Sequence, residues 1–339
     1  MKFIKLIAFA FVQAARASNN FDDIAAAGGN AEVDRQLANE METTTASTVV
    51  AESSEAEVAV TTTAAPEVDP DGFASVDGDF SMVSSLTING GVEGMQVTIQ
   101  PSAVPFVSTY PPDVEYISLT VDGESLTIEI DGEAADGISP KLRIGLPPDQ
   151  VKSISPGGGG TEILNGFTSV EKLQVAWSKI QADLTSNLNP DLQVIIPVSQ
   201  DVNVIVDVVG YVELGAISKA NIQAETVSKV MVSSSSQLTV DGNVGSGIVT
   251  SSSSLTVTGD IEGHIDASSS STVSANTISG SVKASWSSTV YASSCKNVQV
   301  VKFSASQCHR GSVKNGGPLG SSTTIATSAV MMFATLLVL

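Results

Sequence analysis

The chain has 339 residues, of which 36 are acidic and 16 are basic, so its formal charge is −20. This balance disfavours nucleic-acid binding, because phosphate backbones need a basic surface. Two cysteines and two histidines are too few for a metal cluster or a nucleophile with its base, so no metal, catalytic residue or cofactor is expected. Apolar residues make up 42% of the chain and charged residues only 15%, which indicates that part of it packs into a core.

Residues 1–17 predict a secretory signal peptide. Lys2 and Lys5 precede the apolar residues 6–12, and small residues lead to a cleavage site between Ala17 and Ser18. The apolar stretch is too short to span a bilayer. We therefore expect an extracellular protein.

The last residues predict a glycosylphosphatidylinositol (GPI) anchor signal over 316–339. Residues 325–339 contain no charge, and a short polar spacer separates them from small residues that begin at Asn315. Asn315 is the expected lipid attachment residue, with Gly316 as the alternative. A membrane-spanning helix would need about 20 apolar residues, which this tail lacks. A buried terminal strand is the third interpretation. The GPI interpretation places the protein at the cell surface, on the plasma membrane.

Residues 18–79 form an acidic segment that we expect to be a disordered spacer. It contains 14 acidic residues and one basic residue, Arg35, and it has no sustained helical or strand period. Like charges repel, and too little apolar surface is present to offset the chain entropy. Its threonine and serine runs suggest O-glycosylation.

From residue 80 onward the pattern is that of β-strands. Short alternating runs are separated by turns at Asp122-Gly123 and Asp131-Gly132, and the first of these predicts a hairpin or a tight corner. Residues 170–184 also fit a helical period, but their setting among strands favours strands. The glycine run 157–160 lacks the lysine of a phosphate-binding loop, so we expect a flexible surface turn.

A regular repeat runs through the C-terminal part of the chain. One period relates the members of three sets of positions: Val244, Ile261 and Ile278; Ile248, Ile265 and Val282; and Ala267 and Ala284. A separation of four periods relates Val227, Val230 and Val232 to Cys295, Val298 and Val300. Serine runs recur in the same register, at residues 233–236, 251–254 and 268–271, and at 285–288 with Trp286 inserted.

This repeat predicts an all-β fold, a single-stranded β-solenoid of about 17 residues per coil, right-handed by expectation, over residues 80–312. Each apolar position would stack on its equivalent about 4.8 Å along the axis, and serines at the corners would form ladders without like-charge repulsion. The alternative is a serine-rich linker. A linker has no reason to keep branched aliphatic residues in register, so the solenoid is favoured.

The repeats also resemble a known family. Residues 255–261, with the sequence Leu-Thr-Val-Thr-Gly-Asp-Ile, and the segment Ala292-Ser293-Ser294 are similar to the repeated lines of the auto-transporter adhesin family with the head GIN domain. The resemblance covers residues 81–308 and is sharpest over 233–300. It implies a β-helix with a cell-surface adhesion or structural role. It implies no catalytic residues.

Few residues are candidates for chemistry. Cys295 and Cys308 are expected to form a disulfide that closes the terminal coil. His264 and His309 lie too far apart in the repeat to be assumed to converge, and Asp241, Asp260 and Asp266 are isolated. Trp286 interrupts a serine run at a corner, where we expect it to fill a corner cavity; contact with a sugar is the alternative.

The sequence therefore favours a non-enzymatic surface protein of adhesive or structural type. Its expected partners are extracellular glycans, matrix or neighbouring cells, together with the membrane through a lipid anchor. A β-helix polysaccharide lyase or hydrolase is the first alternative, although it would need clustered acidic or basic residues on one face. A mechanical wall or coat component is the second.

Overall fold

The computed structural model describes residues 68–112, 115–135, 137–199 and 201–295, and the backbone of 298–301 and 305–308. Within these ranges the fold is all-β, with 23 strands and no helix, which confirms the expected class. Consequently no described helix has the length and apolar character needed to cross a membrane. The predicted signal peptide, most of the acidic segment and the predicted anchor signal lie outside the described residues.

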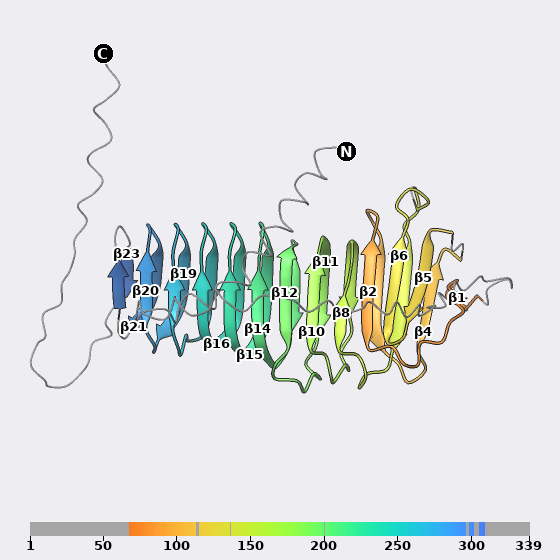
Figure 1. Ribbon diagram of the computed structural model, residues 1–339, viewed down its shortest axis with the longest axis horizontal. Helices are drawn as coiled ribbons and strands as arrows, with labels where there is room; N and C mark the ends of the chain where they lie inside the picture. Colours follow the sequence, from red (N-terminus) through yellow and green to blue (C-terminus); the bar gives the residue numbers. More distant parts are fainter. Residues whose placement is uncertain are drawn as a thin grey trace, which may run out of the picture. The chain divides into compact units, whose positions relative to one another are not determined.

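The strands form two faces of a β-solenoid (Figure 1). The first face stacks β7 (Lys141–Leu146), β3 (Gln96–Pro101), β9 (Gly159–Ile163), β11 (Ser178–Asp183), β13 (Val202–Ile205), β17 (Ser254–Val257), β19 (Thr272–Ile278), β21 (Thr289–Cys295) and β23 (Ala305–Cys308). The second face stacks β6 (Ser125–Ile130), β2 (Ser85–Gly90), β8 (Ser153–Ser155), β10 (Lys172–Ala176), β12 (Gln193–Val198), β14 (Val208–Leu214), β18 (Ile265–Ala267), β20 (Val282–Ser285) and β22 (Val298–Val301). The long strands β15 (Lys219–Val232) and β16 (Gln237–Val249) bend between the faces and belong to both. All pairings within each stack are parallel, as a wound chain requires.

The apolar ladder of the C-terminal coils is the core that the period predicts. Val244 bridges Ile261, and Ile261 bridges Ile278, in parallel register, and all three side chains are buried. The correspondence over four periods also holds, because successive pairings connect Val232 to Val300 through β16, β18 and β20. Each coil contributes one residue to this aliphatic column, and burial of these side chains removes apolar surface from water.

The expected stacking of Ile248 on Ile265 is wrong. Gly247 pairs with Ile265, while Ile248 pairs with Asp266 and is 39% exposed. Val244 pairs with Ile261, and Gly247 pairs with Ile265. The first two residues are three positions apart and their partners are four apart, so the coil that contains Ile261 has one additional residue at this point. Such a shift moves a strand side chain to the opposite face, which explains why Ile248 faces solvent.

The N-terminal end departs from a simple sequential winding. Strand β2 lies between β6 and β8, and β3 lies between β7 and β9, so the first coil is inserted between two later ones (Figure 1). Two antiparallel strands close this end: β4 (Phe106–Tyr110) pairs with β7, and β5 (Ile117–Asp122) pairs with β6. The β5–β6 connection confirms the hairpin expected at Asp122-Gly123.

The folded part begins before residue 80, where its boundary was expected. Strand β1 (Ala74–Val76) pairs antiparallel with β4, and Phe73 and Ala74 are buried. The guanidinium of Arg143 lies 3.8 Å from the Phe73 ring centroid. The sequence pattern did not reveal this strand, because it is short and lies between aspartates in an acidic segment.

Two other local interpretations are settled by the backbone. Residues 172–183 contain strands β10 and β11, so the helical interpretation is excluded. The glycine run was expected to be a flexible turn, which is wrong: Gly159 begins β9, and an added Cβ at Gly157 would lie 2.0 Å from the carbonyl oxygen of Ile88. Gly157 and Gly158 allow two coils to approach closely.

One corner of the solenoid is built around a column of buried serines, which we call the serine corner. It connects the second face to the first and contains Ser178, Ser199, Ser218, Ser236, Ser253, Ser271 and Ser288, all buried. Its hydroxyls bond backbone groups of neighbouring coils and turns. The Ser236 N–H, for example, donates to Oγ of Ser253 at 3.2 Å, and the Ser236 hydroxyl donates to the Gly215 carbonyl at 2.9 Å. The hydroxyls thus satisfy polar groups that burial would otherwise leave unpaired.

Candidate functional site

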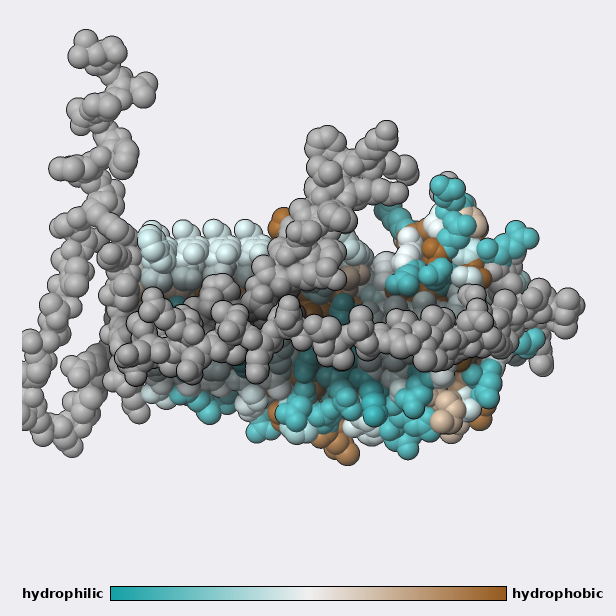
Figure 2. Space-filling view, viewed as in Figure 1, coloured by the Kyte–Doolittle hydropathy of each residue, from teal (hydrophilic) through white to brown (hydrophobic). Residues whose placement is uncertain are grey.

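The outer surface of the serine corner repeats an uncommon backbone conformation. Two consecutive residues per coil have positive φ, immediately before the buried serine: Ala216-Ile217, Ser234-Ser235, Ser251-Ser252, Ser269-Ser270 and Trp286-Ser287. The amide of the second residue donates to the carbonyl of the first residue one coil further, as from Ser252 to Ser269 at 2.8 Å. The corner is therefore a regular ridge, and Figure 2 shows it as an evenly spaced pale row along the edge above β14 to β20.

Both tryptophans of the chain lie on this ridge. Trp286 takes a left-handed position (φ 53°) and is 64% exposed. Trp177 precedes the buried Ser178, also has positive φ (59°) and is 77% exposed. Ile217 is 68% exposed at a neighbouring turn. The ridge thus presents large apolar side chains among serine hydroxyls.

These tryptophans gain little from packing. A bulky residue in the left-handed region costs on the order of 1–3 kcal/mol, and serines occupy the matching positions at 234–235, 251–252 and 269–270 in three of the coils between them. The expectation that Trp286 fills a corner cavity does not fit its exposure, so the structure favours the alternative of an outward contact. A costly conformation that holds an exposed aromatic ring favours a role in contact with another molecule.

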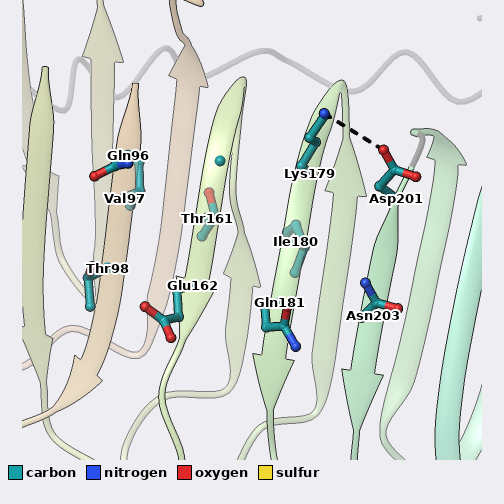
Figure 3. A pocket seen from close by; sticks show the side chains of 11 residues that line it. Gln96, Val97, Thr98, Thr161, Glu162, Lys179, Ile180, Gln181, Asp201 and Asn203 are labelled. Atoms are coloured by element: carbon teal, nitrogen blue, oxygen red, sulfur yellow. Dashed lines mark ion pairs between the residues drawn. The ribbon is translucent and has the colours of Figure 1, made fainter. Parts of the chain in front are cut away.

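A groove of about 460 Å³ crosses four strands of the first face, β3, β9, β11 and β13 (Figure 3). Outward-facing Thr98, Glu162, Gln181 and Asn203 form one row, with one residue from each strand in register. In the neighbouring row, Lys179 Nζ lies 3.8 Å from Asp201 Oδ2, and Gly160 leaves a gap beside Gln96. The groove is shallow and its outward-facing lining is polar.

Asp241, Asp266 and His264 have structural partners in adjacent coils. Asp241 Oδ1 accepts from the Thr258 hydroxyl at 2.7 Å, and Asp266 pairs with Lys283 at 3.2 Å. His264 Nδ1 lies 2.7 Å from Ser281 Oγ. Within the described ranges, no group of three or more such side chains is arranged to hold a metal. His309 lies outside the described residues.

Asp260 belongs to a second ladder, at another corner. The Asp260 N–H donates to Asn243 Oδ1 at 2.9 Å, and Asp260 Oδ1 accepts from the Thr277 N–H at 3.1 Å and from Asn276 Nδ2 at 3.0 Å. The pKa of Asp260 lies below its ordinary value, mainly because the Thr277 side chain donates to the carboxylate; desolvation opposes this effect and is outweighed.

This ladder predicts an acid-sensitive contribution to stability. Since the folded pKa of Asp260 is depressed, its contribution is present above the ordinary carboxyl pKa and is lost as pH falls through the folded value, below about pH 4. Asp260→Asn keeps the oxygen acceptor and removes the titration, as Asn243 shows. Between pH 6 and pH 3 the unfolding temperature should therefore fall less steeply in Asp260→Asn than in the wild type. The exposed control Glu262→Gln should follow the wild type, and equal slopes for all three proteins would contradict the prediction.

The terminal coil contains both cysteines. Cys295 ends β21 and is disulfide-bonded, and the backbone of Cys308 pairs with Ala292 in the neighbouring strand. The Cys308 side chain lies outside the described residues, so the Cys295–Cys308 pairing stays a prediction.

Sequence reasoning found Trp286 but missed Trp177 and the groove. The signal for Trp177 was present, because both tryptophans directly precede a serine. The coil lengths in this part are irregular, so no fixed period aligned Trp177 with Trp286. The spacing from Ile154 to its partner Leu173, for example, is shorter than the spacing from Leu173 to its partner Val194. The groove depends on which residues become neighbours across strands, and the unusual coil order at the N-terminal end decides that.

The fold places the chain in the class of parallel β-solenoid proteins. Comparison with protein-family models and with curated proteins finds no match. The resemblance to the head GIN family therefore stays a prediction.

Several solved structures are similar at low identity. A candidate adhesin from Bacteroides fragilis shares 14% identity, with a TM-score of 0.35, over 69% of this chain and 94% of that one. A candidate lipid-binding protein from Parabacteroides distasonis shares 13% (TM-score 0.38; 69% and 98%), and a candidate cell adhesion protein from Clostridium sporogenes shares 13% (TM-score 0.23; 68% and 99%). At these values we transfer no activity from them.

Proposed function

We propose that this protein is a non-enzymatic, adhesin-like protein of the cell surface, whose serine corner contacts extracellular glycans. The observation that carries the proposal is the placement of both tryptophans, exposed and in left-handed conformations, on one ridge. An indole can stack on the apolar face of a sugar ring, and adjacent hydroxyls can exchange hydrogen bonds with sugar hydroxyls.

The ridge favours binding over catalysis. Glycoside hydrolysis uses two carboxyl groups that flank the scissile bond, with the acid held at a raised pKa. Asp241, Asp260 and Asp266 each bond a partner in an adjacent coil, and the pKa of Asp260 is lowered. A ridge also differs from the concave site in which most enzymes enclose a substrate.

A glycan array tests the proposed binding. The full mature chain should bind at least one class of glycan saturably, and this binding should require the two tryptophans. A mechanical wall or coat role predicts no saturable binding across a broad array, and that result would overturn the adhesive proposal.

Surface display is the second part of the proposal, and it rests on the terminal segments of the sequence. Cleavage after Ala17 and lipid attachment at Asn315, or at Gly316, would leave a mature chain that begins with the acidic segment and is attached to the membrane after the solenoid. The proposed partners are therefore glycans, matrix or neighbouring cells, and the membrane through the anchor.

Phosphatidylinositol-specific phospholipase C should release the protein from intact cells. Most of the surface pool is expected in the medium after treatment, because the enzyme cleaves the lipid that would hold the mature chain on the membrane. Immunoblotting of medium and cells measures the release, and a known GPI-anchored protein of the same cells controls for enzyme activity. Retention of this chain while the control is released would contradict the anchor.

A further inference from the structure

We infer that the groove across β3, β9, β11 and β13 is a binding site for a short stretch of neutral glycan. This inference rests on the adhesive function proposed above and adds a site and a ligand class to it. The groove is distinct from the serine ridge, since none of its lining residues is a ridge residue and all but Asp201 lie in strands of the first face.

The absence of a side chain at Gly160 is not explained by packing. An added Cβ at Gly157 or Gly158 would lie 2.0 Å or 2.8 Å from a backbone oxygen of the neighbouring coil, and Gly159 has a φ of +93°. At Gly160 a Cβ would meet only the Met95 carbonyl oxygen, at an ordinary 3.7 Å. Three of the four glycines are thus required by the fold, and the fourth instead keeps the groove open.

The lining provides a row of polar groups, three of them planar. Thr98, Glu162, Gln181 and Asn203 repeat at the strand spacing, about 4.8 Å, and they point to the same side of the sheet (Figure 3). Carboxylate and amide groups can each engage two hydrogen-bonding partners, so they suit adjacent hydroxyls of a sugar. The volume falls within the usual range for ligand sites.

The charges at the groove select against acidic glycans. Lys179 is the sole cation in the lining, and its ammonium group pairs with Asp201. Glu162 forms no ion pair within the described structure, so the groove carries a net negative charge that would repel uronates, sulfates and sialic acids. A neutral glycan has the required hydroxyls and none of the repelled groups.

The test compares Gly160→Gln with the wild-type full chain on an array of neutral, uronate-containing, sulfated and sialylated oligosaccharides. Gly160→Gln places a side chain in the gap without a backbone clash, so it should retain the wild-type unfolding temperature and lose neutral-glycan affinity by about tenfold or more. Gln181→Ala, at an exposed position, should also weaken binding with the fold intact.

The outcomes separate the two proposals. Unchanged neutral-glycan binding by both Gly160→Gln and Gln181→Ala, or a preference of the wild type for acidic glycans, would overturn the groove assignment and leave the ridge proposal standing. No glycan binding by the wild type would overturn both.

Discussion

Replacing Trp177 and Trp286 together with serine is expected to reduce glycan binding by about 10- to 100-fold while leaving the solenoid intact. Aromatic stacking contributes about 0.5–1.5 kcal/mol per ring beyond area burial, and each 1.4 kcal/mol corresponds to tenfold in affinity. Both rings are largely exposed, so their removal creates no cavity.

The same substitution is expected to maintain or raise the unfolding temperature. Serines already occupy the equivalent positive-φ positions in three of the intervening coils, at residues 234–235, 251–252 and 269–270. The double variant therefore makes the corner more uniform and relieves the cost of two bulky left-handed residues. Lost binding with preserved stability distinguishes a contact role from a structural one.

Titration of a glycan identified on the array gives the affinity, and differential scanning calorimetry gives the unfolding temperature. Tyr291→Ser is the matched control, since Tyr291 is another exposed aromatic residue, 43% accessible, in β21 on the first face. It should bind as the wild type does. Equal affinities for wild type and double variant would show that the ridge is not the contact surface.

Gly242→Ala is expected to destabilise the solenoid by about 3–5 kcal/mol, the largest effect we expect from a single methyl group. Gly242 has a φ of +146°, and an added Cβ would lie 1.6 Å from the carbonyl oxygen of Ala224 in the preceding coil. This oxygen belongs to the backbone of β15, which also pairs with β13 and β14, so it has little freedom to move away.

The position has a specific role in the register of the coils. Gln223 pairs with Asp241, and Thr226 pairs with Asn243, so three steps along β15 match only two steps along β16, and the ladder shifts beside Gly242. Glycine allows the backbone to approach closely at such an irregularity. Without it, the aliphatic ladder beyond Asn243 would lose its alignment.

Urea unfolding followed by far-ultraviolet circular dichroism measures this effect. Gly160→Ala is the matched control, because the same methyl group there meets no atom closer than 3.7 Å, and its stability should stay within about 1 kcal/mol of the wild type. Similar stabilities for the two alanine variants would contradict the proposed close contact at Gly242.

Much of the architecture was readable because neighbouring coils repeat the same chemistry. Val244, Ile261 and Ile278 stack as their spacing predicts, and a column of serines lines one corner. The prediction failed at Ile248. One extra residue in the following coil places Gly247, rather than Ile248, beside the buried Ile265. A period counts residues along the chain, while burial depends on alternation within each strand.

The amino-acid sequence by itself determined the all-β class, the parallel stacking and the approximate coil length. Branched aliphatic residues that recur at a fixed spacing are buried together when successive coils stack in parallel. Only the tertiary structure decided the order of the N-terminal coils, the inclusion of Ala74–Val76 in the sheet and the meeting of Glu162, Gln181 and Asn203 in one groove. These features depend on pairing between segments whose separation follows no period, so the relevant contacts exist only once the chain has folded.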